Sequence, residues 1–136
     1  MIAAVLVGVL ALLGALHLFW ALGGTWGQGV AIPEVGGRPV FRPSRLATAA
    51  VALGLFGAAL AALLRGYFLL GSFPGSPAHW ACVALGVMFL LRAVGEFRLV
   101  GFFKRVHGTA FAAWDTWAFS PLCLLLAAGL LYIATT

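Results

Sequence analysis

The sequence has very few charged residues, and acidic ones are the scarcest. Only 8% of the 136 residues are charged, with three acidic residues against eight basic ones. Because a soluble domain typically carries about 25% charged residues, this chain cannot cover a water-facing surface. The basic residues form no continuous run and no nucleic-acid-binding motif, so we expect no DNA or RNA partner.

Cysteine is also scarce, and the signatures of common catalytic and metal sites are missing. Cys82 and Cys123 lie in apolar segments without a CxxC partner or a neighbouring histidine cluster, which favours a packing role. The sequence contains no HExxH, CxxCH, GxSxG or glycine-rich nucleotide loop. We therefore expect no metal site, assign no cofactor, and favour a non-catalytic function while leaving enzymatic activity open.

Long apolar segments make up most of the chain. Hydrophobic residues account for 64% of the sequence, and the mean hydropathy is +1.13. A membrane-spanning helix needs about 20 mostly apolar residues, and four such segments nearly fill the chain. We predict an all-α polytopic membrane protein, a single four-helix transmembrane domain over residues 1–136. The spans are expected at about residues 2–23, 44–70, 78–100 and 118–135.

Several positions mark where these spans begin. The first apolar segment has no basic residues before it and is longer than the apolar part of a signal peptide, so we expect it to be retained as a span. Ser44 suits an N-cap, and Pro77 suits a first helical turn.

The start of the fourth span is ambiguous. Residues 101–119 mix Lys104, Arg105 and His107 with several aromatic side chains, which is compatible with a short interfacial amphipathic helix before the last span. Ser120 and Pro121 are typical of an N-cap and first turn, but a span counted from there is short. Either the span starts earlier with a kink at Pro121, or it is tilted or lies in a thinned bilayer.

Basic residues are distributed unevenly among the loops. Three lie between residues 38 and 45 and three between residues 98 and 105, whereas the loop at residues 71–77 has none. The positive-inside rule places the basic loops in the cytoplasm. We therefore expect a multi-pass protein of the cytoplasmic membrane with both termini outside. Near the outer surface, Arg65 can extend to the interface, and His79 and Trp80 suit an aromatic belt.

Small residues recur at every fourth position of the second span, at Ala50, Gly54, Ala58, Ala62 and Gly66. Such a stripe lets a neighbouring helix backbone approach closely within a membrane. The partner helix can belong to the same chain or to a second copy, which makes the stripe a candidate homo-oligomer interface.

Among the ionisable residues within the predicted spans, three matter for a site: His17, Arg92 and Glu96. Ionisable groups are costly in a bilayer and are therefore functional candidates. Arg92 and Glu96 are four residues apart and can pair on one helix face. At about 1.5 Å per residue, His17 and Arg92 both lie roughly 3–6 Å to the cytoplasmic side of the midplane. Trp20 is one turn from His17, and Asp115 precedes the fourth span on the same side.

These residues form one polar site if the first and third spans are neighbours. Arg92 would offer a fork of donors to a carboxylate, a phosphate or a backbone carbonyl, which suits a lipid or a small anionic ligand. Glu96 would orient Arg92 or accept a proton, and His17 would titrate or donate a hydrogen bond. In the alternative, Arg92 and Glu96 only neutralise each other, and His17 bonds a carbonyl. A metal site is the third alternative.

The polar site in the cytoplasmic half favours a carrier or a transport-associated subunit. The alternative is a non-catalytic accessory or scaffold protein of a larger membrane complex. A third hypothesis is an intramembrane enzyme that binds a lipid or quinone, although the sequence offers it no recognisable nucleophile or metal set.

Four stretches also suggest a family: HLFWALGGTWG (17–27), GRPVFRP (37–43), RAVGEFRLVGFFKRV (92–106) and FAAWDTWAFSPLCLLL (111–126). They resemble an uncharacterised bacterial family, a domain of unknown function, of small four-span inner-membrane proteins. RAVGEF and DTWAFSPLC are the most specific parts of a match that covers nearly the whole chain. The resemblance implies four spans and a bacterial inner membrane, and it implies no activity. His17, Trp20, Arg92, Glu96 and Asp115 all fall in the matching motifs, and family members often have Asp in place of Glu96.

Overall fold

The structure of the chain is a computed structural model that describes residues 1–68 and 72–136. It is 69% helical. The main helices are α1 (Ile2–Ala21), α3 (Arg45–Tyr67), α5 (Pro77–Val94) and α7 (Ser120–Thr135). The shorter elements are helix α2 (Gln28–Ala31), the antiparallel strands β1 (Glu34–Val35) and β2 (Arg38–Pro39), helix α6 (Ala110–Trp114) and the π-helical segment η1 (Asp115–Phe119).

Four helices are long and apolar enough to cross a membrane, at residues 2–21, 45–67, 77–94 and 110–135. They confirm the predicted all-α, four-helix class, and the chain is a small multi-pass membrane protein. The predicted cap Ser44 is present, because the N–H of Ala47 donates to Ser44 Oγ at 3.1 Å. Pro77 lies in the first turn of α5 as predicted, and the cap there is Ser76, whose Oγ accepts from the N–H of His79 at 3.1 Å. The predicted end of the second span, at residue 70, lies outside the described residues.

The third helix is shorter than predicted, ending at Val94 instead of near residue 100. Gly95 has a φ of +85°, a left-handed conformation that glycine adopts readily and that ends a helix. The chain then turns back, and the N–H of Phe102 donates to the Ala93 carbonyl at 2.8 Å. A Cβ at Gly95 would overlap the Val100 carbonyl, so this return requires glycine.

The last span starts earlier than the predicted residue 118. Segments α6, η1 and α7 form one helix of 26 residues, capped where the N–H of Ala112 donates to Thr109 Oγ1 at 3.0 Å. Within η1 the N–H of Ser120 donates to the Asp115 carbonyl, five residues back, as in a π-helix. Pro121 follows directly and has no N–H to donate. Helix α6 is therefore the first part of this span and no separate interfacial helix.

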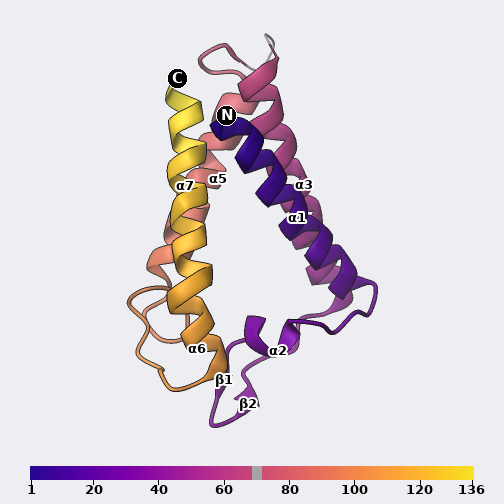
Figure 1. Ribbon diagram of the computed structural model, residues 1–136, viewed down its shortest axis with the longest axis vertical. Helices are drawn as coiled ribbons and strands as arrows, with labels where there is room; N and C mark the ends of the chain where they lie inside the picture. The colour runs from indigo at the N-terminus through magenta and orange to yellow at the C-terminus, as the bar shows by residue number, and fades with distance from the viewer. Residues whose placement is uncertain (69–71) are drawn as a thin grey trace.

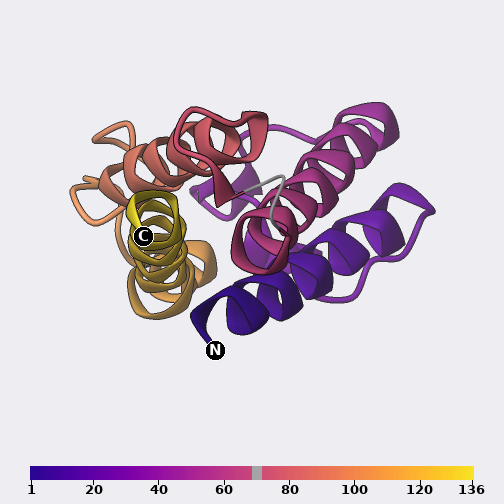
Figure 2. The ribbon, with the colours of Figure 1, turned by 90° about the horizontal axis from the view of Figure 1, so that it is seen from above.

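The four long helices form two pairs, α1 with α3 and α5 with α7 (Figures 1 and 2). Both termini lie at one end of the bundle, where the pairs meet around the fully buried Leu10 and Leu130. Toward the other end the pairs diverge, and α2, β1 and β2 lie there with the loop at residues 95–109 (Figure 1). The fold thus places all the predicted cytoplasmic loops at the end where the pairs separate.

The stripe of small residues divides between two environments. Ala58 and Ala62 are buried inside the chain, and a Cβ at Gly66 would meet the side chain of Ala3 on α1. Ala50 and Gly54 are exposed, and nothing lies within 4 Å of a Cβ built at Gly54. Three of the five residues therefore pack within the chain, and the other two are open to lipid or a second copy.

Candidate functional site

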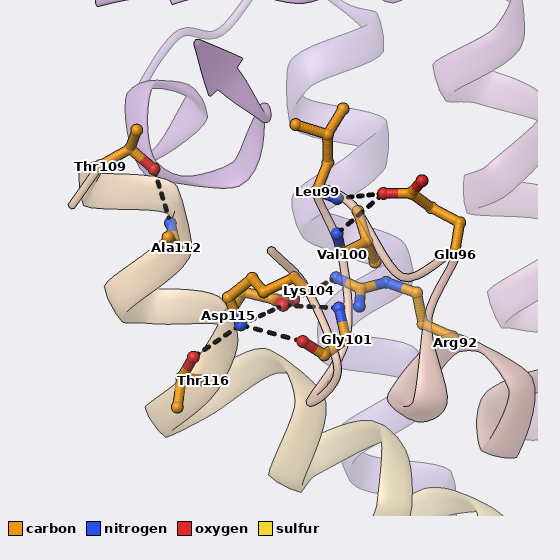
Figure 3. Close-up of polar contacts among 10 residues, drawn as sticks. All are labelled: Arg92, Glu96, Leu99, Val100, Gly101, Lys104, Thr109, Ala112, Asp115 and Thr116. Atoms are coloured by element: carbon orange, nitrogen blue, oxygen red, sulfur yellow. Dashed lines mark hydrogen bonds and ion pairs between the residues drawn. The ribbon is translucent and has the colours of Figure 1, made fainter. Parts of the chain in front are cut away.

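A buried ionic cluster joins the end of α5, the following loop and the start of the last span (Figure 3). At its centre is Asp115, the first residue of η1, which is completely buried. Its Oδ1 accepts a hydrogen bond from Arg92 Nη2 at 2.8 Å. Its Oδ2 accepts from Lys104 Nζ at 3.0 Å and from the N–H of Gly101 at 2.8 Å. Two cations therefore converge on one carboxylate.

Lys104 is a structural partner of Asp115, and it does not lie on a headgroup-facing surface as predicted. Its side chain is buried. Besides Asp115, Nζ donates to the Gly101 carbonyl at 2.9 Å and to Thr116 Oγ1 at 2.6 Å. Since an ammonium has three protons, these three acceptors satisfy it completely.

The predicted pairing of Arg92 with Glu96 is wrong. An i, i+4 pair requires both residues on one helix, and α5 ends two residues before Glu96. The exposed Glu96 instead accepts hydrogen bonds from the N–H of Leu99 and, at 3.2 Å, from that of Val100 (Figure 3). Glu96 therefore holds the returning loop in shape, and Arg92 takes Asp115 as its partner.

His17 and Trp20 form a second polar group, on α1. His17 Nδ1 donates to the Leu13 carbonyl at 2.8 Å, since a carbonyl can only accept. The rings of His17 and Trp20 meet edge to face with centroids 5.0 Å apart. Trp20 Nε1 donates to the Trp26 carbonyl at 2.7 Å, which ties the first loop to α1. No hydrogen bond from residues 1–68 or 72–136 reaches His17 Nε2.

The condition set for a single polar site, that the first and third spans are neighbours, is not met by the main helix pairs, because α1 packs on α3 and α5 on α7. Arg92 and His17 nevertheless line the same cavity of about 680 Å³ between the two helix pairs. Its other walls are mainly apolar and come from every long helix and α2: Leu13, Leu16, Trp20, Trp26, Gly27, Val30, Ala31, Val51, Leu55, Phe89, Trp114, Phe119, Leu122, Cys123 and Leu126.

A second cavity of about 460 Å³ adjoins the first beneath the loop before α3. Both are lined by His17, Trp20 and Arg92, and the smaller one adds the polar side chains of Gln28 and Thr48. The candidate residues from two distant parts of the chain thus stand where the cavities meet.

Arg92 is only partly satisfied. Its side chain is 33% exposed, with Nη2 bound to Asp115. Its Nη1 is buried and has no hydrogen-bond partner in the described part of the chain. A buried donor without an acceptor costs free energy, and a ligand or water that accepts from it removes that cost. Because Lys104 already balances Asp115, the charge of Arg92 is in excess, and the site is suited to an anion.

Of the five candidates, Arg92 and Asp115 bond directly, His17 and Trp20 face the same cavity, and Glu96 lies apart. The sequence interpretation missed Lys104 as a partner of Asp115. A signal was present, because a lone acid inside an apolar span requires a nearby cation. No cluster of three or more His, Cys, Asp or Glu residues suited to a metal occurs among the described residues.

The opposite end of the bundle has its own polar contact. Arg65 Nη2 and His79 Nδ1 both donate to the Ala134 carbonyl near the end of α7, each at 3.0 Å. Arg65 is buried, so the expectation that it extends to the interface is wrong. The two side chains fasten α3 and α5 to α7.

One family model matches the chain over residues 10–130, and its description is "Protein of unknown function (DUF3995)". The match includes every residue of the cluster and of both cavities. No curated protein and no solved structure matches the chain.

Proposed function

The chain belongs to this family of proteins of unknown function, DUF3995, and from its cavity we propose that it is a membrane-embedded binding protein or carrier for a small anionic molecule. The proposed site is the junction of the two cavities, with Arg92 as the main anion-binding residue and His17 as a second polar contact. The observation that carries the proposal is Arg92 itself: its side chain is 33% exposed, it lines a cavity of about 680 Å³, and its Nη1 has no hydrogen-bond partner among the described residues.

The balance of charge around Asp115 supports this assignment. Lys104 is fully satisfied by Asp115, Gly101 and Thr116, so it alone can neutralise the carboxylate. Arg92 then adds a positive charge that the fold does not need for neutrality. A guanidinium can hold Asp115 through one nitrogen and offer the other to a carboxylate or phosphate.

The distribution of basic residues supports an orientation. The loops at residues 22–44 and 95–109 lie at the same end of the bundle (Figure 1). Under the positive-inside rule this end faces the bacterial cytoplasm and both termini face outward. The site then lies in the cytoplasmic half of the bundle, where a carrier would receive or release its anion.

The substitution Arg92→Gln tests the proposal. Because Lys104 remains as the counter-charge of Asp115, the variant is expected to fold. Trp20, Trp26 and Trp114 line the cavity, so binding can be followed by tryptophan fluorescence in nonionic micelles. Inorganic phosphate, acetate and stearate would be titrated in turn, with the exposed Arg105→Gln as the matched control. At least one anion should bind the parent and the control, and bind Arg92→Gln at least about tenfold more weakly. Equal binding by all three proteins, or by none, would reject the proposal.

A second candidate is a non-catalytic accessory or scaffold protein. The ionic cluster by itself, considered without the cavity, favours this candidate, because groups of this chain satisfy all the hydrogen bonds described for Asp115. On that reading Arg92 serves only to join α5 to the last span. Arg92→Gln would then lower stability and alter no anion binding, which separates the two candidates in the same experiment.

A further inference from the structure

We infer that the anion is the headgroup of a single-chain amphiphile, which enters the cavity sideways from the bilayer between α1 and α7. This inference rests on the proposed function and specifies its ligand. It names one chemistry, an anionic head on one hydrocarbon chain, and it depends on three features of the cavity: its open side, the segment that lies over its loop end, and its gradient from polar to apolar.

We place the open side between α1 and the last span, because these two helices diverge along the bundle (Figure 1). These helices contact each other near the termini, where a Cβ at Gly129 would meet the side chain of Leu6. Farther along, Leu16 of α1 and Leu122 of α7 line the cavity instead. Trp26 and Trp114 also line the cavity and are more than half exposed, so the cavity reaches the surface of the bundle near its loop end. Tryptophan at this depth suits the membrane interface, from which an amphiphile of the bilayer can enter.

The loop end is covered by the segment between α1 and α3. Helix α2 packs on α6 and contributes to the lining of both cavities. Two hydrogen bonds fasten this segment, one from Trp20 Nε1 to the Trp26 carbonyl at 2.7 Å and one from the N–H of Ala110 to Glu34 Oε1 at 3.3 Å. A soluble anion would have to enter beside this segment, whereas a molecule already in the bilayer would not.

The lining changes from polar to apolar along the bundle. Arg92 lies in the last turn of α5, near the loop end, and lines the cavity together with His17. Leu13 lies one turn, or about 6 Å, deeper than His17 on α1, and Leu126 lies about 16 Å along the helix from Asp115. The site would thus place a charged head near the membrane surface and a chain toward the midplane, as an amphiphile lies in one leaflet.

The volume of the cavity limits the ligand to one hydrocarbon chain. About 680 Å³ falls within the range of roughly 300–1,000 Å³ typical of pockets for one small molecule. Lipid tails are as apolar as leucine, so entry of the chain from a bilayer gains little by itself. Selectivity must therefore come from Arg92, and the fit of the chain decides which anions reach it.

The test uses the full chain in phosphatidylcholine nanodiscs and measures quenching of tryptophan fluorescence by 9,10-dibromostearate. The methyl ester of this acid is the neutral control. Acetate and inorganic phosphate are the soluble competitors. We expect the acid to bind at least about tenfold more tightly than its ester. The substitution Arg92→Gln should weaken the binding of the acid by about 10- to 100-fold. Acetate and phosphate should not displace it.

Two variants of the apolar cavity wall, which would contact the hydrocarbon chain of the ligand, complete the test. Leu122→Trp and Leu16→Trp narrow the cavity from opposite sides and leave Arg92 in place. Each substitution should therefore weaken the binding of dibromostearate at least about tenfold. Because two variants are tested, the outcome stays decisive even if one of them does not fold. Acetate or phosphate binding to Arg92 as tightly as dibromostearate would overturn the inference and leave the proposed function standing. Ester and acid binding alike, without dependence on Arg92, would overturn both.

Discussion

Replacing Asp115 by Asn should destabilise the fold more than any other change of one charge in this chain. The substitution keeps the shape of the side chain and removes the only anion of the cluster. Asp115 is completely buried and accepts three hydrogen bonds of 2.8–3.0 Å, two of them from cations. Asparagine would leave the buried ammonium of Lys104 facing an amide. Breaking a buried ion pair typically costs about 3–5 kcal/mol, and we expect the free energy of unfolding to fall by that amount.

The assay is reversible unfolding by SDS in mixed micelles, followed by far-ultraviolet circular dichroism. Glu34→Gln is the matched control, since it removes the same charge from a side chain with one hydrogen bond of 3.3 Å. Both ion pairs within residues 1–68 and 72–136 involve Asp115, so Glu34 has none to lose. Its loss should cost about 1 kcal/mol or less.

The double variant Asp115→Asn with Lys104→Met separates charge from packing. Replacing both partners of a buried pair is often nearly neutral, so the double variant should recover at least half of the lost stability. The reasoning is refuted if Asp115→Asn alone stays within about 1 kcal/mol of the parent. It is equally refuted if the two substitutions add without recovery, because the buried charge of Lys104 would then carry no penalty.

Two further predictions concern assembly and orientation. Gly54→Leu should convert a detergent-solubilised dimer to a monomer without unfolding it, because nothing lies within 4 Å of a Cβ at this position. Light scattering after size exclusion measures this, and a parent that is already monomeric would exclude Gly54 from a dimer interface. Single cysteines at Ser76 and Gly108, in a background lacking the native cysteines, should label from opposite sides of intact cells, with Ser76 outside. Labelling of both from the outside would contradict the positive-inside orientation.

The number and class of the spans could be predicted from the sequence because lipid imposes one requirement on every residue of a span. Each spanning segment must be apolar for about 20 residues, and the four apolar segments satisfy this regardless of their neighbours. The ends were harder to predict, because they depend on single residues. Gly95 ends α5 through its positive φ, six residues before the end of the apolar pattern.

Most residues of the candidate site could be identified from the sequence, but which of them pair with each other could not be predicted. Arg92, Asp115 and His17 were identified because ionisable side chains in apolar segments are rare. The pairing of Arg92 with Asp115 spans 23 residues and a folded loop, and no local spacing encodes such a contact. Lys104 lies in a segment with Arg105 and His107, which resembles a solvated surface. Only the return of the loop at Gly95 and Gly101 brings Lys104 inside.

The π-helical segment makes the length of the last span as important as its composition. A π-turn accommodates one residue more than an α-turn, and each residue of an α-helix turns the chain by about 100°. Removing one residue between positions 116 and 119 would restore α-helical geometry and rotate Asp115 by about that angle relative to α7. The carboxylate would leave its cations, although neither it nor they had been replaced. Single-residue insertions and deletions in this segment therefore act as substitutions of Asp115 would, whereas the same changes in the exposed turn at Gly36 and Gly37 would leave the cluster intact.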